Sequence, residues 1–325
     1  MREETIALME NYAVVVVGAS AGGTAALPQL FSNLPADLPA AYFVVQHLFA
    51  ETVSVLPRLL NNASSLPAIH PRDGHVVEPG TIYVAPPNYH LLIHQPGIIE
   101  VSYGARENLH RPAIDPLFRS AARAYGRRTI GILLTGTKDD GSAGLLAIKM
   151  RNGIAIVQDP ADAAYPEMPQ NAIDLVENID YVAPLDEIPA LIEEWVQKLV
   201  NVPIDGNGEE TEMSEQPVAL ICPECGGSLR QVEHGRLIQY HCHVGHTFGL
   251  QSLQAAYAEK TEETLWAALR ALKEQAILLQ QMAARTTTER YRREYLKEAE
   301  AAEEHAKHIN EILHNLGTEA VPGWI

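Results

Sequence analysis

The sequence predicts an α/β fold: a doubly wound, mostly parallel sheet with an antiparallel edge meander, followed by a small Cys/His module and a helical tail. Short β-branched runs alternate with helical patterns from residue 13 to about residue 200, which is typical of a parallel sheet covered on both faces. Three cysteines then cluster between residues 222 and 242. Beyond residue 260, apolar residues recur at alternating spacings of four and three, which predicts helices.

Composition and charge exclude several functional classes. The chain has 325 residues, of which 46% are hydrophobic and 20% charged, so it can bury a core. Its net charge of -17 argues against general nucleic-acid binding and against attraction to anionic membranes. No apolar run approaches the ~20 residues that span a bilayer, and the acidic N-terminus does not resemble a signal peptide. We therefore expect a cytoplasmic protein with no membrane insertion.

Residues 1–200 are expected to form the first domain. Its strands are predicted where continuous apolar runs occur, and its helices between them. Residues 67–103 hold short strand-like pieces separated by Gly and Pro, which we interpret as the antiparallel meander. The predicted strands are Ala13–Val17, Ala41–Gln46, Thr129–Leu134 and Ile154–Val157, and two of the helices are Ile114–Tyr125 and Gly141–Arg151.

Three further segments follow this domain. Residues 201–217 are acidic and contain Gly and Pro without periodicity, which predicts a linker. Residues 218–250 form the Cys/His module, and residues 251–325 are predicted to form a helical hairpin or coiled-coil tail with a break at Thr286–Thr288. The expected apolar seams consist of Leu265, Leu269, Leu272, Ala276, Leu279 and Ala283, and of Tyr295, Ala299, Ala302, Ala306, Ile309, Leu313 and Leu316.

A glycine-rich turn, VVVVGASAGG, follows the first predicted strand and opens a helix. Dinucleotide binding is disfavoured because Ser20 occupies the middle glycine position of G-x-G-x-x-G. The same turn matches the nucleophile elbow G-x-S-x-G, in which the serine hydroxyl projects from the sheet and the amide of Ala21 can stabilise an oxyanion. A Ser20 that merely caps the helix is the alternative.

A nucleophilic serine needs a base and an acid that orients the base. His47 directly follows the second strand, and Asp139 and Asp140 follow the strand that ends near Leu134. The carboxyl ends of parallel strands meet at one edge, so Ser, His and Asp are expected to converge there. A core-edge histidine and an Asx-turn aspartate are the structural alternatives.

Six blocks in register resemble the catalytic domain of the chemotaxis protein-glutamate methylesterases. They are VVVVGASAGG, VVQH, EPGTIYVAPPNYHL, RPAIDPLFRSAA, ILLTGTKDDGSAG and VQDPADAAYPEMPQNAI, within residues 12–196. The resemblance implies hydrolysis of glutamate γ-methyl esters on chemoreceptor cytoplasmic domains, with deamidation of glutamine as a second activity. It implies Ser20 as nucleophile, His47 as general base and then acid, and Asp140 as the residue that orients His47.

The chain departs from the family pattern near the site. Thr137-Lys138 stands where Met-Gly is usual; the Thr137 amide can still face the oxyanion, whereas a side chain at Lys138 makes a positive φ less favourable. Members of the family often carry an N-terminal receiver domain that accepts a phosphoryl group. Only about 12 residues precede the first predicted strand, so we expect no receiver domain and no autoinhibition by such a domain in cis. Family blocks that flank the cleft suggest substrate contacts at Arg111, Arg119, Met168 and Pro169, with packing as the alternative for each.

The Cys/His module has the ligand spacing of a zinc ribbon. Cys222 and Cys225 are two residues apart, and Cys242 and His246 follow at a spacing of three. His241 and His243 are alternative fourth ligands, and reduced cysteines in a small core are the alternative to a metal. We expect a structural zinc ion here, because four protein ligands would leave no coordination position open for chemistry. We expect no cofactor for catalysis.

Two other functions compete with methylester hydrolysis. A non-catalytic signalling scaffold could keep the fold, with the Cys/His and helical segments as its interaction module. A general esterase of small esters is the third possibility. The tail helices are expected to dimerise or to bind a protein partner.

Overall fold

The computed structural model describes residues 11–47, 53–204 and 215–319. The chain divides into two compact units, Met1–Leu253 and Gln254–Ile325. None of the helices among the described residues is long and apolar enough to span a membrane. Most of the predicted acidic linker, residues 205–214, lies outside the described residues.

The first unit contains a seven-stranded sheet in which every neighbouring pair is parallel. The strand order is β3-β4-β2-β1-β7-β8-β9, so the chain winds outward in both directions from β1. Continuous apolar runs form the central strands because both faces of the sheet are covered. The strands are β1 (Ala13–Ala19), β2 (Ala40–Gln46), β3 (Ala68–Ile69), β4 (Ile82–Val84), β7 (Thr129–Leu133), β8 (Ile154–Gln158) and β9 (Tyr181–Ala183).

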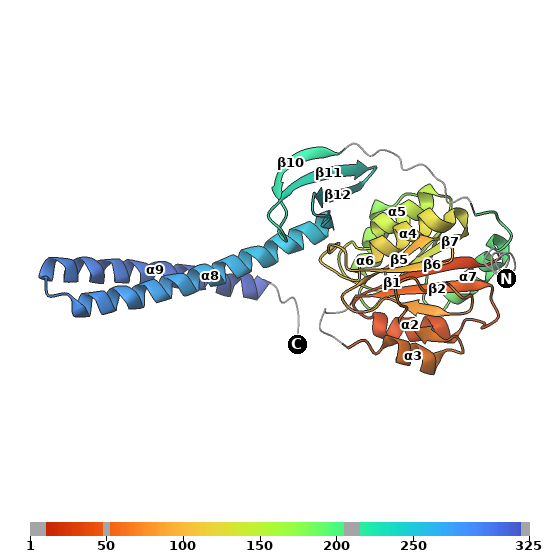
Figure 1. Cartoon of the computed structure of the whole chain (residues 1–325), viewed down its shortest axis with the longest axis horizontal. Coiled ribbons are helices and arrows are strands. Elements are labelled where there is room, and N and C mark those ends of the chain that lie inside the picture. Colours follow the sequence, from red (N-terminus) through yellow and green to blue (C-terminus); the bar gives the residue numbers. More distant parts are fainter. Residues whose placement is uncertain (1–10, 48–52, 205–214, 320–325) are drawn as a thin grey trace. The chain divides into compact units, whose positions relative to one another are not determined.

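Helices cover both faces of this sheet (Figure 1). One face packs against α2 (Gly23–Ser32), α3 (Leu56–Ala63) and α7 (Ile188–Leu199). The other packs against α4 (Ile114–Tyr125), α5 (Ser142–Met150) and α6 (Glu167–Leu175), with the short helix η1 (Gly126–Arg128) before β7. Alternate residues of β1 face the two cores, Val15 one and Val14 the other. The predicted fold class is therefore confirmed.

The region 67–103 differs in detail from the predicted meander. Its first pieces, β3 and β4, join the main sheet as parallel strands, because β4 is buried on both faces. Only β5 (His90–Gln95) and β6 (Ile98–Ser102) are antiparallel, and they form a separate two-stranded sheet. The short turn at Pro96–Gly97 permits this hairpin, with Gly97 at φ +82°.

The Cys/His module is a four-stranded antiparallel sheet within the first unit. It comprises β10 (Gln216–Ile221), β11 (Ser228–His234), β12 (Leu237–Cys242) and β13 (Thr247–Gly249), in that order. Helix α8 (Leu250–Arg285) follows β13 without a break and runs into the second unit, where α9 (Glu289–Glu319) begins after the predicted break. Leu269, Ala306 and Leu313 form the centre of the apolar seam of these helices.

Candidate active site

Three strands of the main sheet end at the same edge and place Ser20, His47 and Asp140 together. Ser20 directly follows β1 and His47 directly follows β2, with Ala19 and Gln46 in register. The amide of Ser20 donates to the carbonyl of Thr135 at 3.0 Å, which ties the end of β1 to the loop after β7. Asp140 lies in that loop, two residues before α5 begins at Ser142. The parallel register thus brings the three side chains to one edge.

The turn after β1 needs small residues for steric reasons. Gly22 lies at φ +82°, a conformation that side chains disfavour. A Cβ atom at Gly23 would overlap the side chain of Gln46. The side-chain amide of Gln46 donates to the carbonyl of Ser20 at 2.7 Å. The turn therefore packs tightly under Ser20 and leaves its side chain partly exposed.

Hydrogen bonds link the three side chains in a chain. Ser20 Oγ lies 3.0 Å from His47 Nδ1, and His47 Nε2 lies 2.7 Å from Asp140 Oδ2. An ionised carboxylate can only accept hydrogen bonds, so the neutral imidazole carries its proton on Nε2. The lone pair of Nδ1 then faces the serine hydroxyl, ready to accept its proton. This arrangement can generate a nucleophilic alkoxide at Ser20.

Asp140 is buried, yet its surroundings keep it ionised. Its carboxylate accepts five N–H groups, from His47 Nε2, the side chain of Asn108 and the amides of Ile114, Asp115 and Gly141. Burial acts to raise the pKa of Asp140, but the hydrogen bond and charge of His47 and the other donors lower it well below its usual range. These donors favour the charged form of the carboxylate, which can hold the imidazole of His47 in one orientation.

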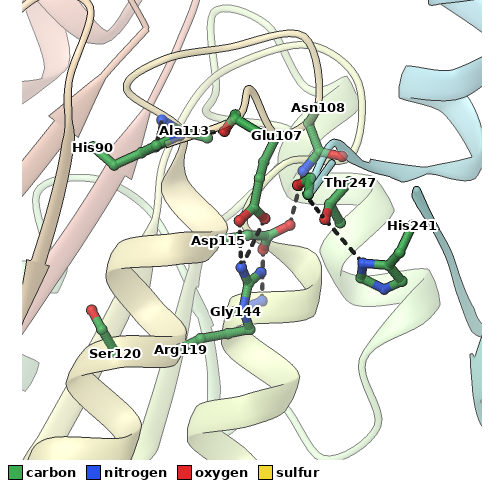
Figure 2. Close-up of polar contacts among 12 residues, drawn as sticks. His90, Glu107, Asn108, Ala113, Asp115, Arg119, Ser120, Gly144, His241 and Thr247 are labelled. Atoms are coloured by element: carbon green, nitrogen blue, oxygen red, sulfur yellow. Dashed lines mark hydrogen bonds and ion pairs between the residues drawn. The ribbon is translucent and has the colours of Figure 1, made fainter. Parts of the chain in front are cut away.

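A second buried acid, Asp115 on α4, shares the donors Asn108 and Gly141 with Asp140. Figure 2 shows Asp115 with Asn108 and Gly144. Its Oδ1 accepts the amides of Gly141 at 3.0 Å and Gly144 at 2.6 Å, at the start of α5. The side-chain amide of Asn108 donates to both acids, to Asp115 Oδ2 at 2.9 Å and to Asp140 Oδ1 at 2.8 Å. Burial, together with the charge of Asp140, raises the pKa of Asp115 well above its ordinary value.

His110 lies against the ring of His47. The ring centroids are 3.7 Å apart and the planes are 12° from parallel. Burial, followed by the proximity of His47, lowers the pKa of His110 to about 3. His110 is therefore neutral near pH 7 and adds no positive charge beside the imidazole of His47.

The two predicted oxyanion amides belong to Ala21, which follows Ser20, and to Thr137, in the loop after β7. Within the described ranges, neither amide donates to a backbone carbonyl. Gly136 is held between the carbonyl of Tyr165 and the amide of Met168, at 3.0 and 2.9 Å, and leaves no space for a Cβ beside Ser20. Lys138 lies at φ +66°, the conformation expected to be unfavourable for a residue with a side chain.

The four suggested substrate contacts have local partners. Arg111 stacks on Tyr103 at 3.7 Å and donates to Asn88, and Arg119 forms two hydrogen bonds with Glu107. Met168 is fully buried in the core and Pro169 is also buried. A substrate role for these four residues stays a prediction.

The predicted metal ligands come together. The ligand atoms of Cys222, Cys225, Cys242 and His246 all lie within 4.8 Å of one another. Cys225 Sγ and Cys242 Sγ are 3.7 Å apart, and His246 Nδ1 lies 3.7 Å from Cys222 Sγ and 3.6 Å from Cys242 Sγ. Zn–S bonds of ~2.3 Å make tetrahedron edges of about 3.8 Å, so these spacings fit a tetrahedral ion. The cluster could hold a metal.

Comparison with known proteins identifies the family. Residues 15–192 match the CheB methylesterase family, and this span is more than half of the chain. The chain belongs to the CheB methylesterase family. A crystal structure of the Thermotoga maritima CheB methylesterase catalytic domain aligns with a TM-score of 0.54 at 34% identity, covering 57% of this chain and 99% of that one.

Other members of the CheB methylesterase family are similar over the same region. A Leptospira interrogans relative, assigned by name to the protein-glutamate methylesterases/protein-glutamine glutaminases, is 38% identical over 181 residues, which are 56% of this chain and 93% of the relative. A Pyrococcus horikoshii protein-glutamate methylesterase/protein-glutamine glutaminase is 36% identical over 197 residues, 60% of this chain and 52% of the relative. The present chain thus spans about half the length of that relative.

Sequence reasoning missed three residues of this CheB methylesterase-family site, Asn108, His110 and Asp115. Asp115 left a signal, because an acid stands beside Ile114 on the apolar face of a predicted helix and a buried acid needs partners. Asn108 and His110 left no signal, because only the fold brings their turn to the triad.

Proposed function

We propose that this chain is a serine hydrolase that demethylates glutamate γ-methyl esters of chemoreceptor-type proteins in the cytoplasm and releases methanol. The observation that carries the proposal is the hydrogen-bonded chain from Ser20 through His47 to the ionised Asp140. Membership of the CheB methylesterase family and the names of similar proteins support the choice of substrate.

The reaction is acyl transfer in two halves. His47 Nδ1 takes the hydroxyl proton as Ser20 Oγ attacks the ester carbonyl, and the negative charge on the carbonyl oxygen meets the amides of Ala21 and Thr137. The imidazolium, stabilised by Asp140, then protonates the departing methoxide, and methanol leaves. Water, deprotonated by His47, hydrolyses the acyl-enzyme and regenerates Ser20. No cofactor enters these steps.

The same residues can deamidate glutamine. The acyl-enzyme forms in the same way, but the leaving group is ammonia, which needs the proton from His47 more than methoxide does. The names of the similar proteins pair the two activities. We propose glutamine deamidation as the second activity.

The Cys/His module and the helices α8 and α9 have a different proposed role. Cys222, Cys225, Cys242 and His246 fit a structural zinc ion, whose four protein ligands would leave no open position for chemistry. Exposed Trp266, Ile277 and Leu278 on α8 suit contact with a protein partner or a second copy of the chain.

A direct test measures methanol release from methylated chemoreceptor cytoplasmic fragments with wild type and with Ser20→Ala. We expect release by wild type and a loss of roughly four to six orders of magnitude in Ser20→Ala. Thermal unfolding checks that the variant is folded. A folded, metal-loaded wild type that neither releases methanol nor reacts with a fluorophosphonate at Ser20 would indicate the scaffold function. Equal turnover of small methyl esters and receptor fragments would indicate a general esterase.

A further inference from the structure

A tight turn at residues 107–110 carries two side chains to the triad. Glu107 and His110 form two backbone hydrogen bonds with each other, at 3.2 and 2.8 Å. The central residues Asn108 and Leu109 lie at φ +51° and +71°, an unfavourable conformation for Leu109 that the surroundings must hold in place. The turn places Asn108 on Asp140 and His110 on His47.

The Cys/His module pairs with this turn through β13. The amide of Asn108 donates to the carbonyl of Thr247 at 2.8 Å, and the amide of Thr247 donates to the carbonyl of Arg106 at 3.4 Å. The Thr247 side chain contacts His241 of β12, 2.9 Å away, and Glu107 is tied to α4 through Arg119 (Figure 2). The turn is therefore held between helix α4 and the Cys/His module.

Asn108 is the residue where the two parts meet. Its side-chain oxygen accepts the amide of Gly249, the last residue of β13, at 2.8 Å. Its side-chain nitrogen uses both hydrogens on the acids Asp115 and Asp140. Asn108 is buried, and every polar atom of its side chain has a partner. One amide thus connects the module's backbone to the carboxylate that orients His47.

A second connection lies beside Asp140. The carboxylate of Asp139 accepts the amides of Gln251 and Ser252 at 2.9 and 3.2 Å and also the Ser252 hydroxyl, so it caps the first turn of α8. A Cβ atom at Gly249 would overlap this carboxylate. The close approach of Gly249 to Asp139 therefore depends on the glycine.

The metal ligands lie next to these contacts in the chain. His246 directly precedes Thr247, and the amide of Cys242 donates to the carbonyl of His246 at 3.1 Å. An ion held by Cys242 and His246 would fix the turn that aims β13 at Asn108.

We propose that Asn108 is a positioning residue for Asp140 and that the Cys/His module holds it there, so that β13 and the start of α8 are a structural part of the active site. The proposal rests on the proposed hydrolase function and deepens it. The module is then required for full turnover, even though none of its residues touches the ester.

The test compares wild type, Asn108→Ala, Gly249→Ala and the double variant. Two rates are measured, methanol release from methylated receptor fragments and fluorophosphonate labelling of Ser20, each from about pH 5 to about pH 9. Gly104→Ala is the matched control, because a methyl group there meets only ordinary contacts at 3.6 and 3.7 Å. Zinc content and thermal unfolding are recorded for every variant.

We expect kcat and the labelling rate to fall between about 10- and 100-fold in both single variants, with KM little changed. The double variant should lose less than the product of the two single losses, because the contact between the Gly249 amide and Asn108 is already absent in Asn108→Ala and only the overlap with Asp139 is added. Asp140 loses the Asn108 donor in Asn108→Ala, and in Gly249→Ala the proposal expects that donor to be misplaced. A carboxylate with fewer donors holds a proton to higher pH, so the acid limb of the pH–rate profile should move to higher pH in both variants.

Specific results would overturn the proposal. Gly249→Ala with unchanged rates, single-variant losses that multiply in the double variant, or rates that fall without movement of the acid limb would each contradict it while leaving the hydrolase function intact. A wild type that neither releases methanol nor labels would remove the hydrolase function and this proposal together.

Discussion

The imidazole of His110 lies flat on the imidazole of His47, with the ring centroids 3.7 Å apart. Burial and the proximity of His47 lower the pKa of His110 to about 3, so the covering ring is neutral near pH 7. A neutral ring can exclude water from one face of His47 and limit its rotation without opposing the positive charge that forms during proton transfer.

The lowered pKa of His110, caused first by burial and then by the proximity of His47, makes the free energy of unfolding depend on pH. An unfolded histidine titrates near pH 6.5, so below that pH the unfolded chain binds a proton at His110 that the folded chain does not. The contribution of His110 is fully present above about pH 6.5 and is lost as the pH falls toward about 3. The slope from this one proton approaches about 1.4 kcal/mol per pH unit.

Urea denaturation between about pH 4.5 and about pH 7.5 measures this slope. We expect His110→Gln to lose less stability than wild type on acidification. The difference between the two proteins carries the test, because burial also lowers the pKa of His90 and of His241. Equal slopes in both proteins would contradict a neutral, buried His110.

Asp140→Asn should inactivate the enzyme while leaving the fold in place. All the hydrogen-bond partners named for the Asp140 carboxylate are donors, so an amide nitrogen at this position must face another N–H group. The carboxylate that favours the Nε2-protonated tautomer of His47 is then absent. We expect a loss of about 10⁴-fold in kcat and of about 1–3 kcal/mol in the free energy of unfolding. Methanol release and urea denaturation measure the two effects, and activity within tenfold of wild type would contradict the proposed triad.

Lys138→Gly should stabilise the protein. Lys138 lies at φ +66°, where a side chain is unfavourable and glycine is not. Relief of this strain, reduced by the greater freedom of glycine in the unfolded chain, should raise the free energy of unfolding by about 0.5–1 kcal/mol. Lys138→Ala is the control, because it removes the amine and keeps the strain. A gain of similar size in Lys138→Ala would show that charge, rather than backbone conformation, is responsible.

Cys222→Ser should abolish metal binding, whereas His243→Ala should not. Cys222 belongs to the four-residue cluster, and His243 is exposed and lies outside it. Zinc measured by elemental analysis should fall from about one ion per chain to near zero in Cys222→Ser only. Hydrogen exchange of β11 and β12 should rise in the same variant. Loss of the ion in His243→Ala would reassign the fourth ligand.

Local patterns determined much of this protein. Apolar runs that end in small residues predicted the central strands because such a run must be buried on both faces, and helix Ile114–Tyr125 was predicted with its observed bounds. Because parallel strands end at one edge of a sheet, the positions of Ser20, His47 and Asp140 along the chain were enough to predict that they converge. Ligand spacing sufficed for the Cys/His cluster, because two short turns supply all four atoms.

Other features depend on contacts between segments far apart in the sequence, and only the tertiary structure decided them. Burial between β2 and β3 made β4 a parallel strand instead of part of a meander. Packing placed Met168 inside the core. Asn108 meets Gly249, and Asp139 caps α8, across more than a hundred residues of sequence. No local periodicity encodes such pairs, because their geometry is set by how the module packs against the loop after β7 and the turn at residues 107–110.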